Sequence, residues 1–216
     1  SNDGDVVTFS VDSAKSSDIG NHRVNGTATM IDANDDTITA QTLTISGKIG
    51  TTTSAIAAGA SAATVASGIN DVASLTGVTA TATTKVKLHS MTTAGTVTFT
   101  LGNDAASGGS ASISATISDV SDLRAIKDAI NAKAGTTGIT AEVHSTGNSA
   151  LVLSHSTGED IKITAFTHDG GNTTSHMHLD VLDQDGLAVT EGAGFANSVI
   201  LNDVTTDDNS LVTAAS

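Results

Sequence analysis

The sequence predicts a fold of the α+β class that is mainly β, with two modules that each run strand, strand, helix, strand, strand. Apolar and polar residues alternate with a period of two along many short segments, and clusters of Gly, Asn and Asp separate these segments. Only two segments place apolar residues at helical spacing. In each module we therefore expect an antiparallel sheet with one short helix on one face.

Strands are expected wherever the alternation is clear. Successive side chains of a strand point to opposite faces, so this pattern is typical of a sheet with one buried face. Proline is absent, so the turns between strands depend on Gly, Asn and Asp. The predicted strands cover residues 6–12, 42–47, 85–90, 96–102, 110–118, 150–155 and 160–166.

The first helix is expected to begin after Ser61, whose hydroxyl is a suitable N-cap. Its apolar stripe consists of Ala62, Val65, Ile69 and Val72. A stripe of this width predicts a short amphipathic helix that covers a sheet.

The second helix is expected to begin after Ser121. Leu123, Ile126 and Ile130 share one face, and Gly135 is expected to end the helix.

One pattern occurs in both modules at the same spacing. Ile69-Asn70 precedes the sequence TGVTA, which starts at residue 76, and Ile130-Asn131 precedes TGITA, which starts at residue 137. We expect each isoleucine to anchor the last helical turn to the sheet and each asparagine to bond local backbone groups. Gly77 and Gly138 are expected to let the chain reverse into the next strand.

The repeat divides the chain into four parts. The two modules are expected at residues 40–94 and 95–165. Residues 1–39 form a β-rich segment that could pair with the C-terminal part, and residues 166–216 are rich in strands and loops. Stacking two small modules buries apolar faces that each module alone would leave exposed to water.

Composition excludes several classes of partner. The formal net charge is −14 with only nine Lys and Arg residues, which disfavours nucleic acid and anionic membrane surfaces. No apolar run approaches the roughly 18 residues that a membrane span needs. We expect no cofactor, and the catalytic motifs of metalloproteases, α/β-hydrolases and P-loop enzymes do not occur, so we expect no enzyme.

The repeated pattern resembles a motif of a known protein family. The segment from Ser121 to Ile163, with Ala129-Ile130-Asn131 and the following TGITA, closely resembles the flagellin hook IN motif. That motif occurs in outer domains of bacterial flagellins and in some flagellar hook-associated and filament-cap proteins. The first copy is a weaker match, with Gly68 inside its helix.

The resemblance implies a structural protein of the bacterial flagellum. It implies an extracellular, surface-exposed outer domain that assembles with other flagellin subunits through core regions absent from this chain, and it implies that some hydroxyl groups carry O-linked sugars. The sequence has no sustained heptads and no initiator methionine, so we expect a fragment that is monomeric in isolation.

Two alternatives stay open. Thr, Asn and Asp on a β surface could form an adhesin module that binds glycans, or the chain could belong to a hook-associated or cap protein. His176 and His178 alternate on one expected strand face, and His168 with Asp169 could approach them to bind Zn²⁺ or Cu²⁺. Solvent-facing histidines on an exposed hairpin are the favoured interpretation of this cluster.

Overall fold

The computed structural model describes residues 29–32, 39–103, 108–170, 177–183, 186–188, 198–201 and 209–213. Within them the fold is mainly β with few short helices, and every strand pair is antiparallel. The predicted fold class is therefore confirmed. The predicted strand at residues 6–12 lies outside the described residues.

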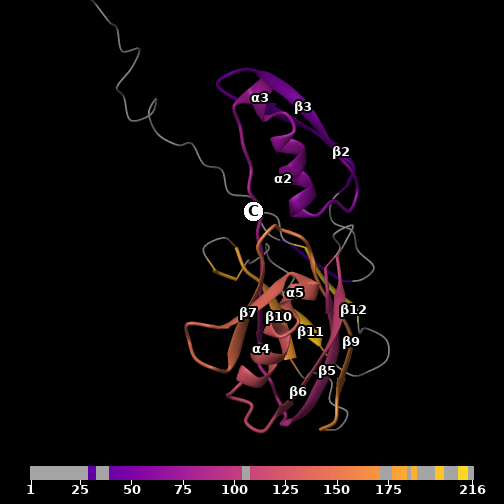
Figure 1. The fold of residues 1–216 in the computed structure, drawn as a ribbon, viewed down its shortest axis with the longest axis vertical. Coiled ribbons are helices and arrows are strands. Elements are labelled where there is room, and N and C mark those ends of the chain that lie inside the picture. Colours follow the sequence, from indigo (N-terminus) through magenta and orange to yellow (C-terminus); the bar gives the residue numbers. More distant parts are fainter. Residues whose placement is uncertain are drawn as a thin grey trace, which may run out of the picture.

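Two five-stranded sheets form the body of the molecule (Figure 1). The first sheet has the order β1 (Thr29–Asp32), β12 (Asn209–Thr213), β9 (Ile161–His168), β5 (Gly95–Gly102) and β6 (Ser110–Ile117). The second has the order β11 (Ser198–Leu201), β10 (Met177–Val181), β4 (Thr84–His89), β8 (Ala150–His155) and β7 (Ile139–Val143). Both sheets thus combine strands from the middle of the chain with strands near its ends.

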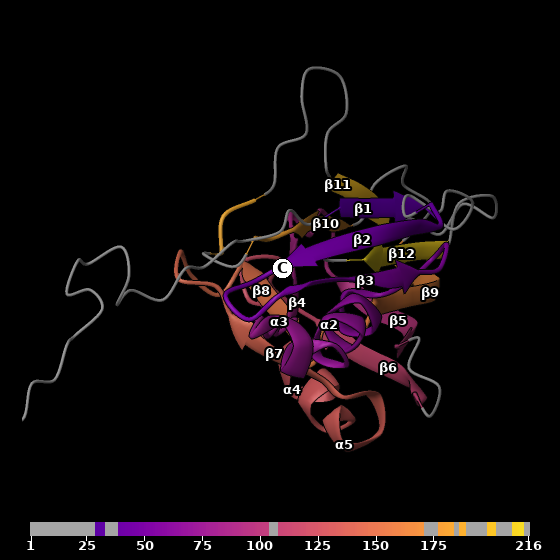
Figure 2. The same cartoon turned by 90° about the horizontal axis from the view of Figure 1, so that it is seen from above.

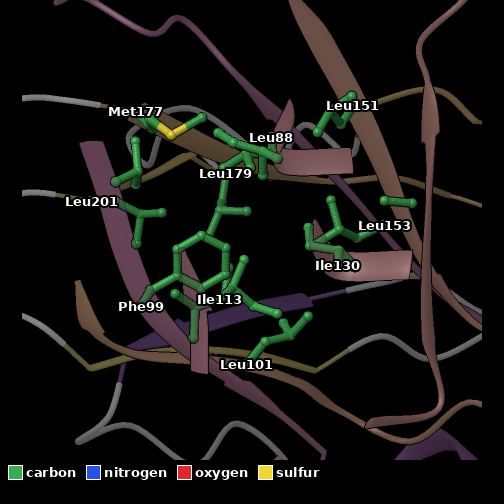
Figure 3. Close-up of a cluster of buried hydrophobic side chains, with 14 of the residues drawn as sticks. Leu88, Phe99, Leu101, Ile113, Ile130, Leu151, Leu153, Met177, Leu179 and Leu201 are labelled. Carbon is green, nitrogen blue, oxygen red and sulfur yellow. The ribbon is translucent and has the colours of Figure 1, made fainter. Parts of the chain in front are cut away.

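One hydrophobic core joins the two sheets (Figure 3). Phe99 and Phe166 come from neighbouring strands of the first sheet, and their stacked rings lie 6.3 Å apart between centroids. Leu88, Leu151 and Leu179 of the second sheet are fully buried in the same cluster. Each such side chain stabilises the fold by about 1.5–3 kcal/mol relative to an exposed one, so burial in this shared core holds the sheets together.

A smaller unit projects from the body. The strands β2 (Gln41–Ser46) and β3 (Thr51–Ile56) form a hairpin in continuous register. The helices α2 (Ala62–Asn70) and α3 (Ala73–Thr76) pack against β3. Figure 2 shows α2 along one side of this hairpin. Residues 77–83, which belong to no strand, lead from the unit into β4 of the body.

The helix α2 begins as predicted, and of its predicted stripe Ala62 is buried. The Ser61 side chain accepts a hydrogen bond from the Thr64 backbone N–H at 3.3 Å, which confirms the N-cap. Its buried residues are Ala62 and Ala66, whereas Val65, Ile69 and Val72 of the predicted stripe are half-buried. Alanine is favoured because the helix lies close to β3: a Cβ added to Gly68 would stand 2.7 Å from Ser54 Oγ.

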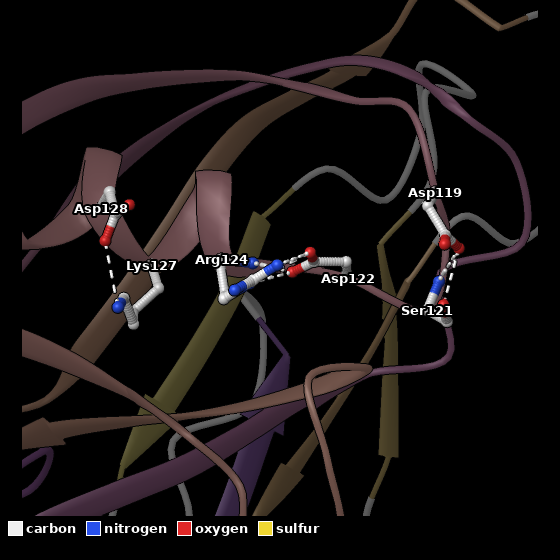
Figure 4. A network of polar contacts seen from close by, with 6 residues as sticks. All are labelled: Asp119, Ser121, Asp122, Arg124, Lys127 and Asp128. Atoms are coloured by element: carbon white, nitrogen blue, oxygen red, sulfur yellow. Dashed lines mark hydrogen bonds and ion pairs between the residues drawn. The ribbon is translucent and has the colours of Figure 1, made fainter.

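The second helix differs from the prediction at both ends. It is divided into α4 (Arg124–Asn131) and α5 (Ala134–Thr137), so Gly135 lies inside α5 rather than at a helix end. Ser121 is not the N-cap, because its backbone N–H and its hydroxyl both donate to Asp119 (Figure 4). Asp122 instead accepts from the backbone N–H of Arg124 at 3.1 Å. The N-cap position is Leu123, which makes no side-chain cap bond, and the Asp122 carboxylate bonds the first helical N–H from the residue before it.

The second module has the predicted element order, whereas the first lacks the predicted strand directly after its helix, because residues 77–83 belong to no strand. In neither module do the strands form one sheet. In the second module, β5 and β6 belong to the first sheet and β7 and β8 to the second. The physical reason is α4, which contacts both β6 and β7 and buries Ile126 and Ile130 between them. In the first module only β2 and β3 pair with each other, and β4 pairs with β8 of the second module.

Candidate functional site

The repeated pattern builds a bond network around Asn131. Its side-chain Nδ2 donates to the Ala141 carbonyl, and its Oδ1 accepts from the Ala141 backbone N–H, both at 2.8 Å. Ala141 lies in β7, which is the last strand of its sheet. The amide of Asn131 thus occupies the free edge of β7 as a neighbouring strand would, and it ties the end of α4 to that edge.

Asn70 makes the same two bonds in the first module. Its side chain bonds the backbone N–H and carbonyl of Ala80, both at 2.9 Å. The sequence correctly suggested a bond to the backbone, and the structure places the partner ten residues further along the chain. We call each such pair of bonds an asparagine clamp.

Two buried threonines complete the network, and sequence reasoning missed them. Thr137 Oγ1 donates to the Lys133 carbonyl and accepts from the backbone N–H of Ile139, and Thr76 does the same with Val72 and Val78. Both threonines are fully buried. Their signal was present, since each is the first letter of the repeated TGVTA and TGITA segments.

The glycines after these threonines have the predicted role. Gly77 and Gly138 end α3 and α5 with φ angles of 75° and 71°, a left-handed conformation that other residues adopt only with strain. A Cβ on Gly138 would stand 2.6 Å from His155 Nε2, whereas a Cβ on Gly77 would meet only the exposed side chain of Ile49. The chain reverses at both positions.

The two copies differ in burial. Ile130 is fully buried in the main core, and Ile69 is half-buried in the smaller unit. The residues after Gly138 form β7, but those after Gly77 form no strand. The local bonds of the motif are therefore conserved between copies, and its packing depends on what surrounds each copy.

The turn after β8 joins the projecting unit to the body. Ser61 Oγ donates to Glu159 Oε2 at 3.1 Å, and the Ala63 backbone N–H donates to the Gly158 carbonyl at 3.0 Å. The backbone N–H of Glu159 in turn donates to His155 Nδ1 at 3.3 Å. Burial lowers the pKa of His155, against an opposing effect of Glu159, so the ring stays neutral and accepts this bond.

A charged cluster lies on the second sheet, and sequence reasoning did not identify it. Asp180 of β10 contacts Lys87 Nζ at 2.8 Å and His89 Nε2 at 2.9 Å, both on β4. Burial raises the pKa of Asp180, but hydrogen bonds from Lys87 and His89 outweigh it and hold the pKa below its usual value. The ring of His178 lies 5.7 Å from that of His89. Lys87 and His89 also line an open cleft with a volume of about 470 Å³.

The structure places the predicted metal ligands apart. His168 and Asp169 lie at the end of β9 in the first sheet, whereas His178 lies on β10 in the second, and His176 is outside the described residues. His168 Nδ1 accepts from the Gly170 backbone N–H, and its Nε2 contacts the Thr93 carbonyl. In the part of the chain that the structure describes, no group of three His, Asp or Glu side chains could hold a metal ion.

Both asparagine clamps lie in segments that match a known protein family. A family model described as the flagellin hook IN motif matches the chain twice, over residues 42–94 and 96–157, which together exceed half of its length. The chain belongs to this family. It is accordingly a flagellar structural protein, and each hook IN copy contains one asparagine clamp. The resemblance identified from the sequence is confirmed in both modules.

Other comparisons add less. The D2-D3 domains of the flagellar cap protein FliD from Escherichia coli are 16% identical in sequence, with 88% of this chain and 94% of that chain covered, at a TM-score of 0.29. A comparison with curated proteins found no match. Among the residues that the structure describes, no helix has the length and hydropathy to cross a membrane.

Proposed function

We propose that this chain is a surface-exposed outer part of a flagellin, the subunit of the bacterial flagellar filament, and that it is extracellular and has no enzymatic activity. The asparagine clamps carry this proposal. In both hook IN copies the characteristic polar side chains bond the protein's own backbone, so the motif builds a rigid structure rather than a reactive one.

The role is mechanical and colloidal. Many copies that project from a helical filament core would thicken the filament and give it an acidic coat, since each copy carries a formal net charge of −14. Self-repulsion at this charge keeps an isolated segment monomeric and soluble, with neither nucleic acid nor membrane as a partner. The assembly partners are other flagellin subunits.

Residues 40–94 and 95–165 are proposed as the two repeat units, and residues 1–39 and 166–216 as segments that complete the sheets. The pairing of β1 with β12 supports this division, because it joins the N-terminal and C-terminal segments. The favoured interpretation of His168, Asp169, His176 and His178, that they bind no metal, can be tested by Zn²⁺ titration against a His178→Ala variant.

Labelling of single cysteines on living cells tests the proposal. This chain contains no cysteine, so a Thr140→Cys substitution at an exposed position of β7 gives one defined labelling site within it. A membrane-impermeant fluorescent maleimide should label the filaments along their whole length. The unsubstituted subunit is the control and gives the background labelling.

The pattern of the label separates the alternatives. A single spot at the filament tip would assign the chain to a cap protein, and a spot at the filament base would assign it to a hook-associated protein. Cells whose flagella carry no label, although the variant protein is made, would overturn the flagellar assignment at the cell surface.

A further inference from the structure

The charge of this protein is distributed unevenly. Between Gln41 and Thr83 the only charged residues are Lys48 and Asp71, so the projecting unit has no net charge. The whole formal charge of −14 belongs to the rest of the chain. The acidic remainder of two copies is therefore a source of mutual repulsion, and this unit is not.

The hairpin of this unit has an uncovered outer face. Its inner face holds Ile45 and Ile56, which are buried toward α2 and α3. The outward side chains pair across the strands as Thr42 with Ala55, Thr44 with Thr53, and Ser46 with Thr51, and all of them are exposed. We call these six residues the neutral face.

The two strands that carry the neutral face lack the features that normally prevent strands of different molecules from associating. Proteins protect exposed edge strands with charged side chains, proline or β-bulges. Neither β2 nor β3 contains a charge or a proline, and their register is continuous from Gln41–Ile56 to Ser46–Thr51. Within the described residues these strands pair only with each other, so each also presents an open edge.

Exposed apolar side chains lie at the tip of the unit, in and beside the hairpin turn that also carries the exposed Lys48. Ile49 in the hairpin turn is 69% exposed, and Leu75 in α3 is 58% exposed. They lie close together, because the Ile49 backbone N–H donates to the carbonyl of Thr76, which follows Leu75. Both side chains would be removed from water by a partner that covers the tip.

We propose that the neutral face is a contact surface for a second copy of this chain. Small Thr, Ser and Ala side chains let two such faces approach closely, and one surface meeting its own copy about a two-fold axis needs no other partner surface. A charged partner would gain nothing here, whereas a second copy meets no net charge of its own sign at this unit.

The contact is weak between isolated chains and is populated where copies are held close together. That condition rests on the proposed function, since a filament would supply the high local concentration. The surface itself can be tested on the purified chain. A negative result there would remove this inference and leave the cell-labelling test of the proposed function unaffected.

Disulfide trapping in the purified chain provides the test, because the chain has no cysteine of its own. Thr44→Cys places one thiol on the neutral face. Thr140→Cys is the matched control, since Thr140 is also an exposed threonine on an edge strand, but it lies beside Glu142 in the charged body. At equal concentration Thr44→Cys should form disulfide-linked dimers at least roughly tenfold faster, the equivalent of 1.4 kcal/mol in contact free energy.

Added salt and a charge substitution provide two further tests of the contact surface. Because salt screens the repulsion between the acidic bodies, dimer formation by Thr44→Cys should exceed the control at both low and high salt and rise as salt is added. Adding Thr53→Asp to Thr44→Cys should return the rate to that of the control. Circular dichroism would verify that these variants are folded. Equal rates for the two cysteine variants, or a rate that Thr53→Asp leaves unchanged, would overturn the proposal.

Discussion

The asparagine clamp of the second hook IN copy allows a quantitative prediction. Replacing Asn131 with Ala removes both side-chain hydrogen bonds to Ala141 and leaves the covalent backbone unchanged. Ala141 is only 2% exposed and lies in the edge strand β7. Its backbone N–H and carbonyl would therefore lose their partners at a position that water reaches poorly.

The expected loss follows from the number of bonds. A typical intramolecular hydrogen bond contributes about 0.5–1.5 kcal/mol to stability, so two bonds predict that Asn131→Ala lowers the free energy of unfolding by about 2 kcal/mol. In a chain of this size that corresponds to a decrease in Tm of about 4–8 °C. Asn70→Ala should cost at most about 1 kcal/mol, because Ala80 is half-buried, lies outside any strand and can bond water instead.

Urea unfolding followed by circular dichroism measures both variants against the unsubstituted chain. Each substitution introduces the same helix-favouring alanine at the end of a helix, so the difference between the variants isolates the effect of burial. A loss below about 0.5 kcal/mol for Asn131→Ala would refute the role of the clamp. An equal loss for Asn70→Ala would refute the argument from burial.

Other predictions use the same paired design. Gly138→Ala should destabilise the protein by about 2–3 kcal/mol in urea unfolding, since it adds a clash with His155 to the left-handed strain, whereas Gly77→Ala should cost about 1 kcal/mol from strain alone. Equal losses of stability for Gly138→Ala and Gly77→Ala would contradict the expected clash with His155. Burial lowers the pKa of His155 below its ordinary value of 6.5, so the unfolded chain binds the proton more readily. Stability from the neutral ring should be complete above pH 6.5 and decline as the pH falls below it. The stability of His155→Gln should depend less on pH than that of the unsubstituted chain between pH 7.5 and 5.5, and an identical pH dependence would contradict this role.

Local features were predictable because they depend on neighbouring residues. The strands at 42–47, 85–90, 110–118 and 150–155 agree with the structure to within one residue at each end, since alternation reports a strand with one buried face. The N-cap at Ser61 was also correct. The predicted cap at Ser121 was wrong, because the Ser121 hydroxyl donates to Asp119 and the helix begins later, with Leu123 at the N-cap position.

The site was predictable only in part. Repetition identified Asn70 and Asn131, but their bonding partners stand ten residues further on, beyond what helix-end rules describe. The cluster of Lys87, His89 and Asp180 carried no signal at all. Its members meet because β4 and β10 pair, although the strands lie far apart in the sequence.

The sequence by itself determined the class of fold, the order of elements in the second module and membership of the hook IN family, because these follow from local periodicity and a repeated pattern. Only the tertiary structure decided that β4 pairs with β8 across the modules and that α4 separates β6 from β7. Backbone hydrogen bonds are the same for every residue type, so a strand does not encode its partner. Partner choice came from burying the apolar faces of both modules in one core.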